Sequence, residues 1–88
     1  MTPLPSLELY VTDDCHTCRR AEQTLTSCQE LHDLVSLRVV HLDRDAIEPP
    51  AGVTSVPTVM CRGVVLALGT PDCGHLVETL RLLLAQTA

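Results

Sequence analysis

The segment LELYVTDDCHTC, residues 7–18, decides the fold that this sequence predicts. Its first half, Leu7 to Thr12, alternates apolar and mixed residues with a period of two, which is typical of a strand with one buried face. Two aspartates then indicate a turn, and Cys15 and Cys18 follow with two residues between them. We therefore expect a pair of cysteines directly after a strand, where the next element begins.

An amphipathic helix is expected to begin near the cysteines and to end near Leu34. Five apolar residues recur there at steps of three and four, namely Ala21, Leu25, Cys28, Leu31 and Val35. The charged residues fall mostly between them, as they do on the solvent face of a helix. Because a free cysteine on an apolar stripe usually behaves as a small hydrophobe, Cys28 is assigned to the core.

Residues 37–42 return to strand character and are rich in β-branched side chains. A strand, a helix and a second strand in this order predict a parallel βαβ unit, because a crossover helix returns the chain to the same end of the sheet. The stretch 43–55 contains Pro49, Pro50 and Gly52. We expect it to be a connection with at most one helical turn.

The second half of the chain predicts a hairpin and a helix. Residues 57–61 and 64–68 are apolar and flank Arg62-Gly63, which fits a tight antiparallel turn. Thr70 is expected to cap the last helix, with Pro71 at its first position and Asp72 beside its positive end. The fold class is therefore α/β: a βαβ unit followed by ββα, with a four-stranded mixed sheet flanked by helices.

Length and composition limit the function classes. With 88 residues the chain is expected to form a single domain, with a core from about residue 7 to residue 85. The formal net charge is −5 and there is no basic run, which argues against nucleic acid as a partner. The longest apolar stretches are far shorter than the roughly 20 residues of a bilayer span, and the N-terminus does not read as a secretory signal. We expect no membrane association, and a cytoplasmic location.

The cysteine pair predicts thiol–disulfide chemistry. At the start of a helix, unpaired N–H groups and the helix dipole favour the thiolate of Cys15, which is the nucleophile. Cys18, one turn along, can attack the mixed disulfide that Cys15 forms with a substrate. His16 would stabilise the thiolate when protonated, whereas Asp13 and Asp14 would raise the pKa of the thiol. The sequence leaves the acidity of Cys15 open.

A second motif, Val56-Pro57, lies about forty residues downstream, and with it the chain resembles the thioredoxin superfamily. It is most similar to small glutaredoxin-like proteins, including a bacterial group with a Cys-His-x-Cys motif. The matching segments are Cys15-His16-Thr17-Cys18, Leu42-Asp43-Arg44-Asp45 and Val56-Pro57-Thr58-Val59. The resemblance covers about residues 7–84 and implies a glutaredoxin-like thioredoxin fold. It also implies that Pro57 is cis and that the backbone of Val56 pairs with a peptide or with glutathione.

The same resemblance implies further substrate-binding residues. In glutaredoxins a Gly-Gly-x-Asp segment grips the amino group of glutathione, and Gly69-Thr70-Pro71-Asp72 loosely resembles it. Gly69 and Asp72 are therefore candidate substrate-binding residues. Cys73, at an electropositive helix start, is a candidate third redox thiol, although a structural role is favoured for it. Cys61 is expected to be structural or partly exposed.

The leading hypothesis is a dithiol oxidoreductase that reduces protein or low-molecular-weight disulfides. It requires no cofactor, takes glutathione as a candidate co-substrate, and receives electrons from thioredoxin reductase or a glutathione system. One alternative is a module that binds zinc or an iron–sulfur cluster through Cys15 and another thiol, since zinc ribbons share the Cys-x-x-Cys spacing. A second pair is missing, so no metal ligands are assigned, and His32, His41 and His75 are expected to be solvent-facing or incidental. Another alternative is a non-catalytic interaction protein on the same fold.

Overall fold

A computed structural model describes residues 3–86 of the chain. The elements, in order, are β1 (Ser6–Val11), α1 (His16–Ser27), α2 (Gln29–Leu34), β2 (Ser36–His41), β3 (Thr58–Cys61), β4 (Val64–Leu68) and α3 (Cys73–Gln86). The strands form one sheet in the order β2-β1-β3-β4, with β1 parallel to β2 and the other neighbours antiparallel. The predicted α/β architecture with a four-stranded mixed sheet is confirmed. The strands begin and end within one residue of the expected positions.

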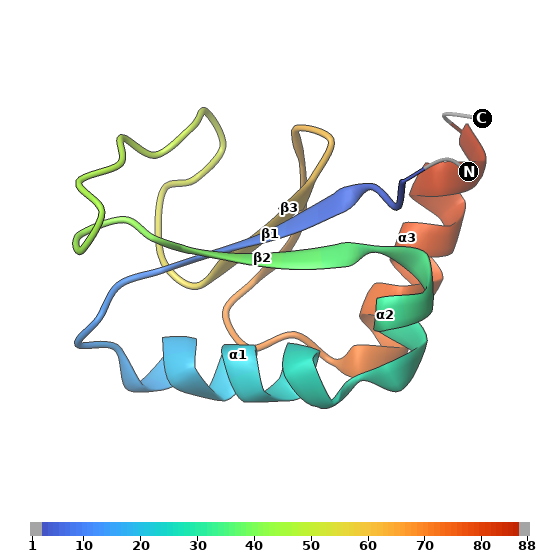
Figure 1. The fold of residues 1–88 in the computed structure, drawn as a ribbon, viewed down its shortest axis with the longest axis horizontal. Helices are drawn as coiled ribbons and strands as arrows, with labels where there is room; N and C mark the ends of the chain where they lie inside the picture. Colours follow the sequence, from blue (N-terminus) through green and yellow to red (C-terminus); the bar gives the residue numbers. More distant parts are fainter. Residues whose placement is uncertain (1–2, 87–88) are drawn as a thin grey trace.

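The helices pack against one face of the sheet (Figure 1). Leu7, Leu9 and Val11 alternate along the central strand β1 and point to this side, where none is more than 2% exposed. They pack in one cluster with side chains of all three helices, including Leu25 and Leu80. Full burial of a side chain of this size contributes about 1.5–3 kcal/mol. This core fixes the position of α1 below the carboxyl end of β1.

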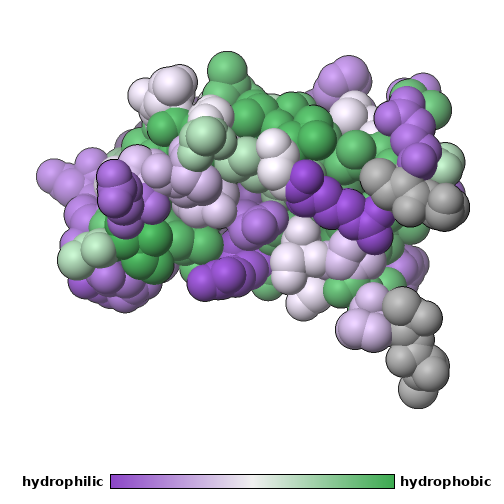
Figure 2. All heavy atoms as spheres, turned by 90° about the horizontal axis from the view of Figure 1, so that it is seen from above, coloured by the Kyte–Doolittle hydropathy of each residue, from purple (hydrophilic) through white to green (hydrophobic). Residues whose placement is uncertain are grey.

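The opposite face of the sheet carries a second, smaller cluster. Tyr10, Val40 and Met60 are buried there, and Leu42 and Val53 from the connection between β2 and β3 pack against them. Figure 2 looks down on this face, where hydrophobic and polar side chains lie side by side. The connection contains turns but no helix, as expected.

The expected single helix is divided into α1 and α2 at Cys28, so its continuation to Leu34 was wrong. Cys28 has extended backbone angles, φ −84° and ψ 92°, and its N–H donates to the carbonyl of Leu25 as a C-cap. Its side chain is buried, as predicted, but it forms a disulfide with Cys73. Hydrophobic periodicity did not reveal the break, because Leu31 and Val35 stay buried on the same side after it.

The last helix begins later than expected, because Asp72 and not Thr70 is its N-cap. The carboxylate of Asp72 accepts a hydrogen bond from the N–H of His75 at 2.9 Å, and its carbonyl accepts one from Leu76 at 2.9 Å. Aspartate is a stronger N-cap than threonine. Pro71 therefore lies just outside the helix.

The hairpin between β3 and β4 turns at Arg62 and Gly63, as predicted. Both residues have positive φ, 53° and 79°, as a two-residue type I′ turn requires. Within the described residues, no helix combines the length and the apolar content that a bilayer crossing needs.

Candidate functional site

The Cys15–Cys18 disulfide lies at the start of α1, directly after the turn that follows β1. Cys15 is the N-cap of this helix, and its Sγ accepts a hydrogen bond from the N–H of Cys18 at 3.1 Å. The two residues differ in exposure: Cys15 is half-buried, whereas Cys18 is 2% exposed. One sulfur can therefore be reached from solvent while the other is covered by the core.

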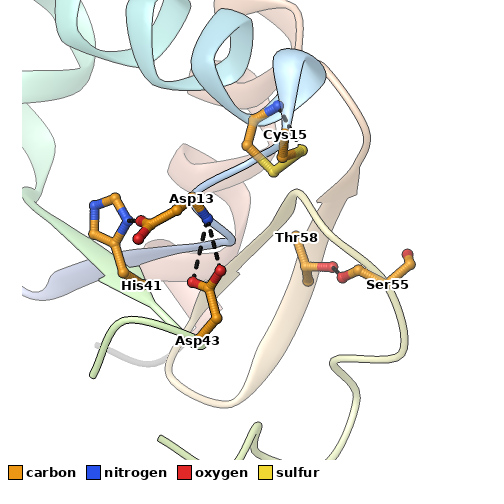
Figure 3. The surroundings of a disulfide bond; sticks show 7 residues. Asp13, Cys15, His41, Asp43, Ser55 and Thr58 are labelled. Atoms are coloured by element: carbon orange, nitrogen blue, oxygen red, sulfur yellow. Dashed lines mark hydrogen bonds and ion pairs between the residues drawn. A yellow bond between two sulfur atoms is a disulfide. The ribbon is translucent and has the colours of Figure 1, made fainter. Parts of the chain in front are cut away.

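Asp13, in the turn before the cysteines, is held by the end of β2 (Figure 3). Its carboxylate pairs with Nδ1 of His41 at 3.0 Å and with the guanidinium of Arg44 at 2.9 Å. Its N–H donates to both carboxylate oxygens of Asp43, at 3.2 and 3.1 Å. We call Asp13, His41, Asp43 and Arg44 the aspartate cluster. It fastens the turn that carries Cys15 to the neighbouring strand.

This cluster was not predicted from the sequence, and the expectation that His41 is solvent-facing or incidental was wrong. The parallel register places His41 opposite Val11, so the residues that follow both strands meet at one edge of the sheet. The signal was present in the predicted βαβ unit, because the carboxyl ends of parallel strands lie together. His32 also has partners, since its Nε2 lies 3.1 Å from the carbonyl oxygens of Leu25 and Thr26.

The aspartate cluster also sets the charge near Cys15. The N–H of Asp13 holds the pKa of the Asp43 carboxyl below its ordinary value of 3.8. The negative charge of Asp13 lies against the positive charge of Arg44. Asp14 and His16 are exposed, and their side chains have no hydrogen bond or ion pair with any residue from 3 to 86. Asp14 is thus the carboxylate near Cys15 whose charge is open to solvent.

The Val56-Pro57 segment lies between the connection and β3, and its peptide bond is cis, as the resemblance implies. No hydrogen bond within residues 3–86 involves the backbone of Val56. The neighbouring Thr58 is fully buried, and its hydroxyl donates to the carbonyl of Ser55 at 2.6 Å. Ser55 and Thr58 both lie in the surroundings of the Cys15–Cys18 bond (Figure 3). Gly69 joins this segment, because its N–H donates to the carbonyl of Pro57 at 2.9 Å.

Asp72 and Cys73, at the start of α3, lie beside the carboxyl end of α1. Cys73 is bonded to Cys28, and their Cα atoms are 5.9 Å apart. Because Cys15 and Cys28 are the two caps of α1, they are separated by about 20 Å at 1.5 Å per helical residue. The structure therefore brings Gly69 to the Val56-Pro57 segment, but it does not bring Asp72 or Cys73 to Cys15.

The remaining cysteine, Cys61, is a fully buried free thiol. Burial, with a smaller contribution from the charge of Glu8, raises the pKa of this thiol. The expectation of a structural role fits this position, whereas partial exposure was wrong. Among residues 3–86 there is no group of three or more histidine, cysteine, aspartate or glutamate side chains arranged to hold a metal ion.

A hollow of about 630 Å³ lies beside α1 and not at the cysteines. It is lined by Arg19, Glu22, Gln23, Thr26, Ser27, His41 and Arg44. These side chains are polar and of both charges, which is typical of a solvated surface. We centre the candidate site on the Cys15–Cys18 bond, because it joins a half-buried sulfur to a buried one. No protein-family model matches the chain, and a search of curated proteins finds no significant match.

Proposed function

We propose that the protein is a dithiol–disulfide oxidoreductase with a glutaredoxin-like thioredoxin fold. The βαβ-ββα order and the sheet order β2-β1-β3-β4 support the fold assignment. One observation supports the proposed activity most directly: a half-buried Cys15 is bonded to a buried Cys18 at the first turn of α1. This asymmetry suits an attacking thiol that meets the substrate and a resolving thiol that meets only Cys15.

The proposed reaction uses two thiol–disulfide exchanges. The Cys15 thiolate attacks one sulfur of the substrate disulfide, so that a Cys15–substrate bond forms and the other substrate sulfur leaves as a thiolate and takes up a proton. Cys18, after loss of its proton, attacks Sγ of Cys15, which forms the Cys15–Cys18 disulfide and releases the second substrate sulfur. The dithiol loses two electrons and two protons, and the substrate gains them.

The surroundings of Cys15 support its role as the thiolate. The N–H of Cys18 donates to the sulfur of Cys15, and the positive end of the α1 dipole favours negative charge at this position. The pairing of Asp13 with Arg44 offsets the repulsion that this aspartate would exert on a thiolate. Asp14 remains to oppose it.

The substrate is proposed to approach along Val56. Its backbone N–H and carbonyl, which have no partner among residues 3–86, can pair with an extended peptide or with glutathione. Glutathione stays a proposed co-substrate. Asp72, however, lies at the other end of α1, which argues against its binding the amino group of glutathione as the resemblance implies. A thioredoxin reductase or a glutathione system would restore the dithiol, and the reducing cytosol is the compartment that fits this cycle.

Coupled turnover tests the proposal. The purified protein, supplied with thioredoxin reductase and NADPH or with glutathione and its reductase, is expected to reduce insulin or hydroxyethyl disulfide. The Cys15→Ser variant should be inactive, and Cys18→Ser should trap a mixed disulfide with the substrate that mass spectrometry detects. The matched control is Cys61→Ala, which removes a thiol outside the site and should retain activity. Inactivity of the wild-type protein with both electron donors would refute the proposal.

A further inference from the structure

A small apolar hollow lies next to Val56 and is formed by the connection between β2 and β3. Its volume is about 210 Å³, and it is lined by Leu42, Pro49, Val53, Thr54, Ser55 and Val56. None of these described lining residues is charged. Sites for drug-sized ligands usually measure about 300–1,000 Å³, so this hollow suits a single side chain.

The wall of the hollow is packed onto the sheet. Val53 and Leu42 contact the cluster of Tyr10, Val40 and Met60. Beside Val53, Gly52 has φ +98°, and a Cβ there would lie 3.2 Å from Cγ2 of Val65. The connection therefore lies close against the sheet, and the hollow is preformed rather than assembled by a ligand.

The hollow adjoins the proposed substrate path, because Val56 belongs to both. Ser55 lies in the surroundings of the Cys15–Cys18 bond (Figure 3), and the backbone of Val56 is free to pair with a peptide within the described chain. A peptide paired at Val56, with its cysteine at Cys15, would have a neighbouring side chain at the hollow. Since four of the six lining residues are apolar and none is charged, an apolar side chain would be desolvated there with little polar surface to cover.

We propose that this hollow is a specificity subsite, which takes an aliphatic side chain one or two residues from the substrate cysteine. The inference rests on the proposed function and identifies its substrates as protein or peptide disulfides rather than glutathione. Glutathione presents carboxylates and no aliphatic side chain to such a site. The charge near Cys15 also disfavours the carboxylates of glutathione, since Asp14 is open to solvent and the chain has a net charge of −5.

The test uses single-turnover reduction, which needs no reductase. Protein is reduced with dithiothreitol, freed of it, and mixed with disulfides of short peptides that differ only in one residue on either side of the cysteine. With leucine at the favoured position, the second-order rate constant is expected to be at least about tenfold higher than with serine or aspartate. Hydroxyethyl disulfide, which has no side chain for the hollow, is the reference substrate.

Two variants locate the effect. Val53→Glu places a charge in the lining, and Thr54→Asp does so at an exposed residue whose change leaves the buried cluster intact. Both should lower the ratio of the leucine-peptide rate to the hydroxyethyl disulfide rate to about one-tenth or less. The matched control is Gln23→Glu, which adds a charge on the exposed side of α1 and should leave the ratio unchanged.

The outcomes separate this inference from the proposed function. Reduction of hydroxyethyl disulfide together with equal rates for all peptides would overturn the subsite and leave the oxidoreductase proposal standing. A preference for leucine that survives in Thr54→Asp would place the apolar contact elsewhere and also overturn it. Failure to reduce any disulfide, hydroxyethyl disulfide included, would remove both proposals.

Discussion

The two ends of α1 each hold a disulfide, and the two bonds differ in almost every respect. At the start of the helix, Cys15 and Cys18 are three residues apart and Cys15 is half-buried. At its end, Cys28 is 3% exposed and is bonded to Cys73, 45 residues away. A bond across three residues restricts the unfolded chain little, whereas one across 45 restricts it strongly. One helix therefore separates a bond suited to exchange from a bond suited to stability.

The largest expected effect is on stability. Removal of the long-range bond by Cys28→Ala with Cys73→Ala should lower the free energy of unfolding by about 4 kcal/mol. The matched change, Cys15→Ala with Cys18→Ala, should cost about 2 kcal/mol because it opens a much shorter loop. Urea unfolding of both oxidised double variants measures the difference. Equal losses, or a larger loss at Cys15–Cys18, would contradict the division of roles.

The next prediction concerns the order of reduction. Under native conditions, rising dithiothreitol should open the Cys15–Cys18 bond before the Cys28–Cys73 bond, because exchange needs access to a sulfur. Alkylation followed by mass spectrometry identifies the opened pair. Cys61 should stay unlabelled until the protein unfolds, since it is fully buried and burial raises the pKa of its thiol. Labelling of Cys28 and Cys73 before Cys15 and Cys18 would contradict the assignment of Cys15–Cys18 as the bond suited to exchange.

A smaller effect is expected from the ion pairs at the two ends of α1. Asp13→Asn breaks the contact with Arg44, whose side chain is 60% exposed against 41% for Asp13, so the loss should be about 1 kcal/mol or less. The matched change at the other end is Glu30→Gln, because Glu30 pairs with Arg81 at 3.7 Å and both are more exposed. Thermal unfolding at low and high salt should give the larger loss for Asp13→Asn, and this loss should persist better at high salt because less exposed pairs are screened less. Equal losses would mean that the aspartate cluster holds the turn no better than a surface pair.

The smallest expected effect is a dependence on acid pH. Asp43 has a lowered pKa in the folded protein, chiefly because the N–H of Asp13 donates to its carboxylate. Its contribution to stability is therefore present above the ordinary value of 3.8 and is lost as pH falls through the lower folded value. An NMR titration of the Asp43 carboxyl should give a midpoint below 3.8, and Asp13→Asn, which keeps the donating N–H, should keep most of this shift. A midpoint at or above 3.8 would show that the hydrogen bond is absent in solution.

The strands and the hairpin were predictable because their signals are local. Alternation along Leu7 to Thr12 depends on one buried face, and the Arg62-Gly63 turn depends on a glycine that accepts positive φ. The position of Cys15 at the start of a helix followed from the same kind of pattern. These features need no knowledge of how distant segments meet.

Most of the features that were missed depend on distant segments. The Cys28–Cys73 bond requires the start of α3 to lie against the end of α1, which periodicity does not specify. The contact between Asp13 and His41 depends on the register of two parallel strands, in which His41 is opposite Val11. The resemblance to a glutathione-gripping segment suggested that Asp72 lies near Cys15, yet its place is set by the helix that it caps.

Tyr10 is the single aromatic residue of the chain, and its position makes the two faces of the sheet separately observable. It is 9% exposed and lies with Val40 and Met60 on the face away from the helices. Its fluorescence therefore reports on the loop-covered face, while far-UV circular dichroism is dominated by the helices on the other. Coincident melting of the two signals would indicate one cooperative unit, and an earlier change in fluorescence would indicate that the connection between β2 and β3 detaches first. A chain with so few aromatic residues thus has a built-in optical probe on the face that lines the apolar hollow.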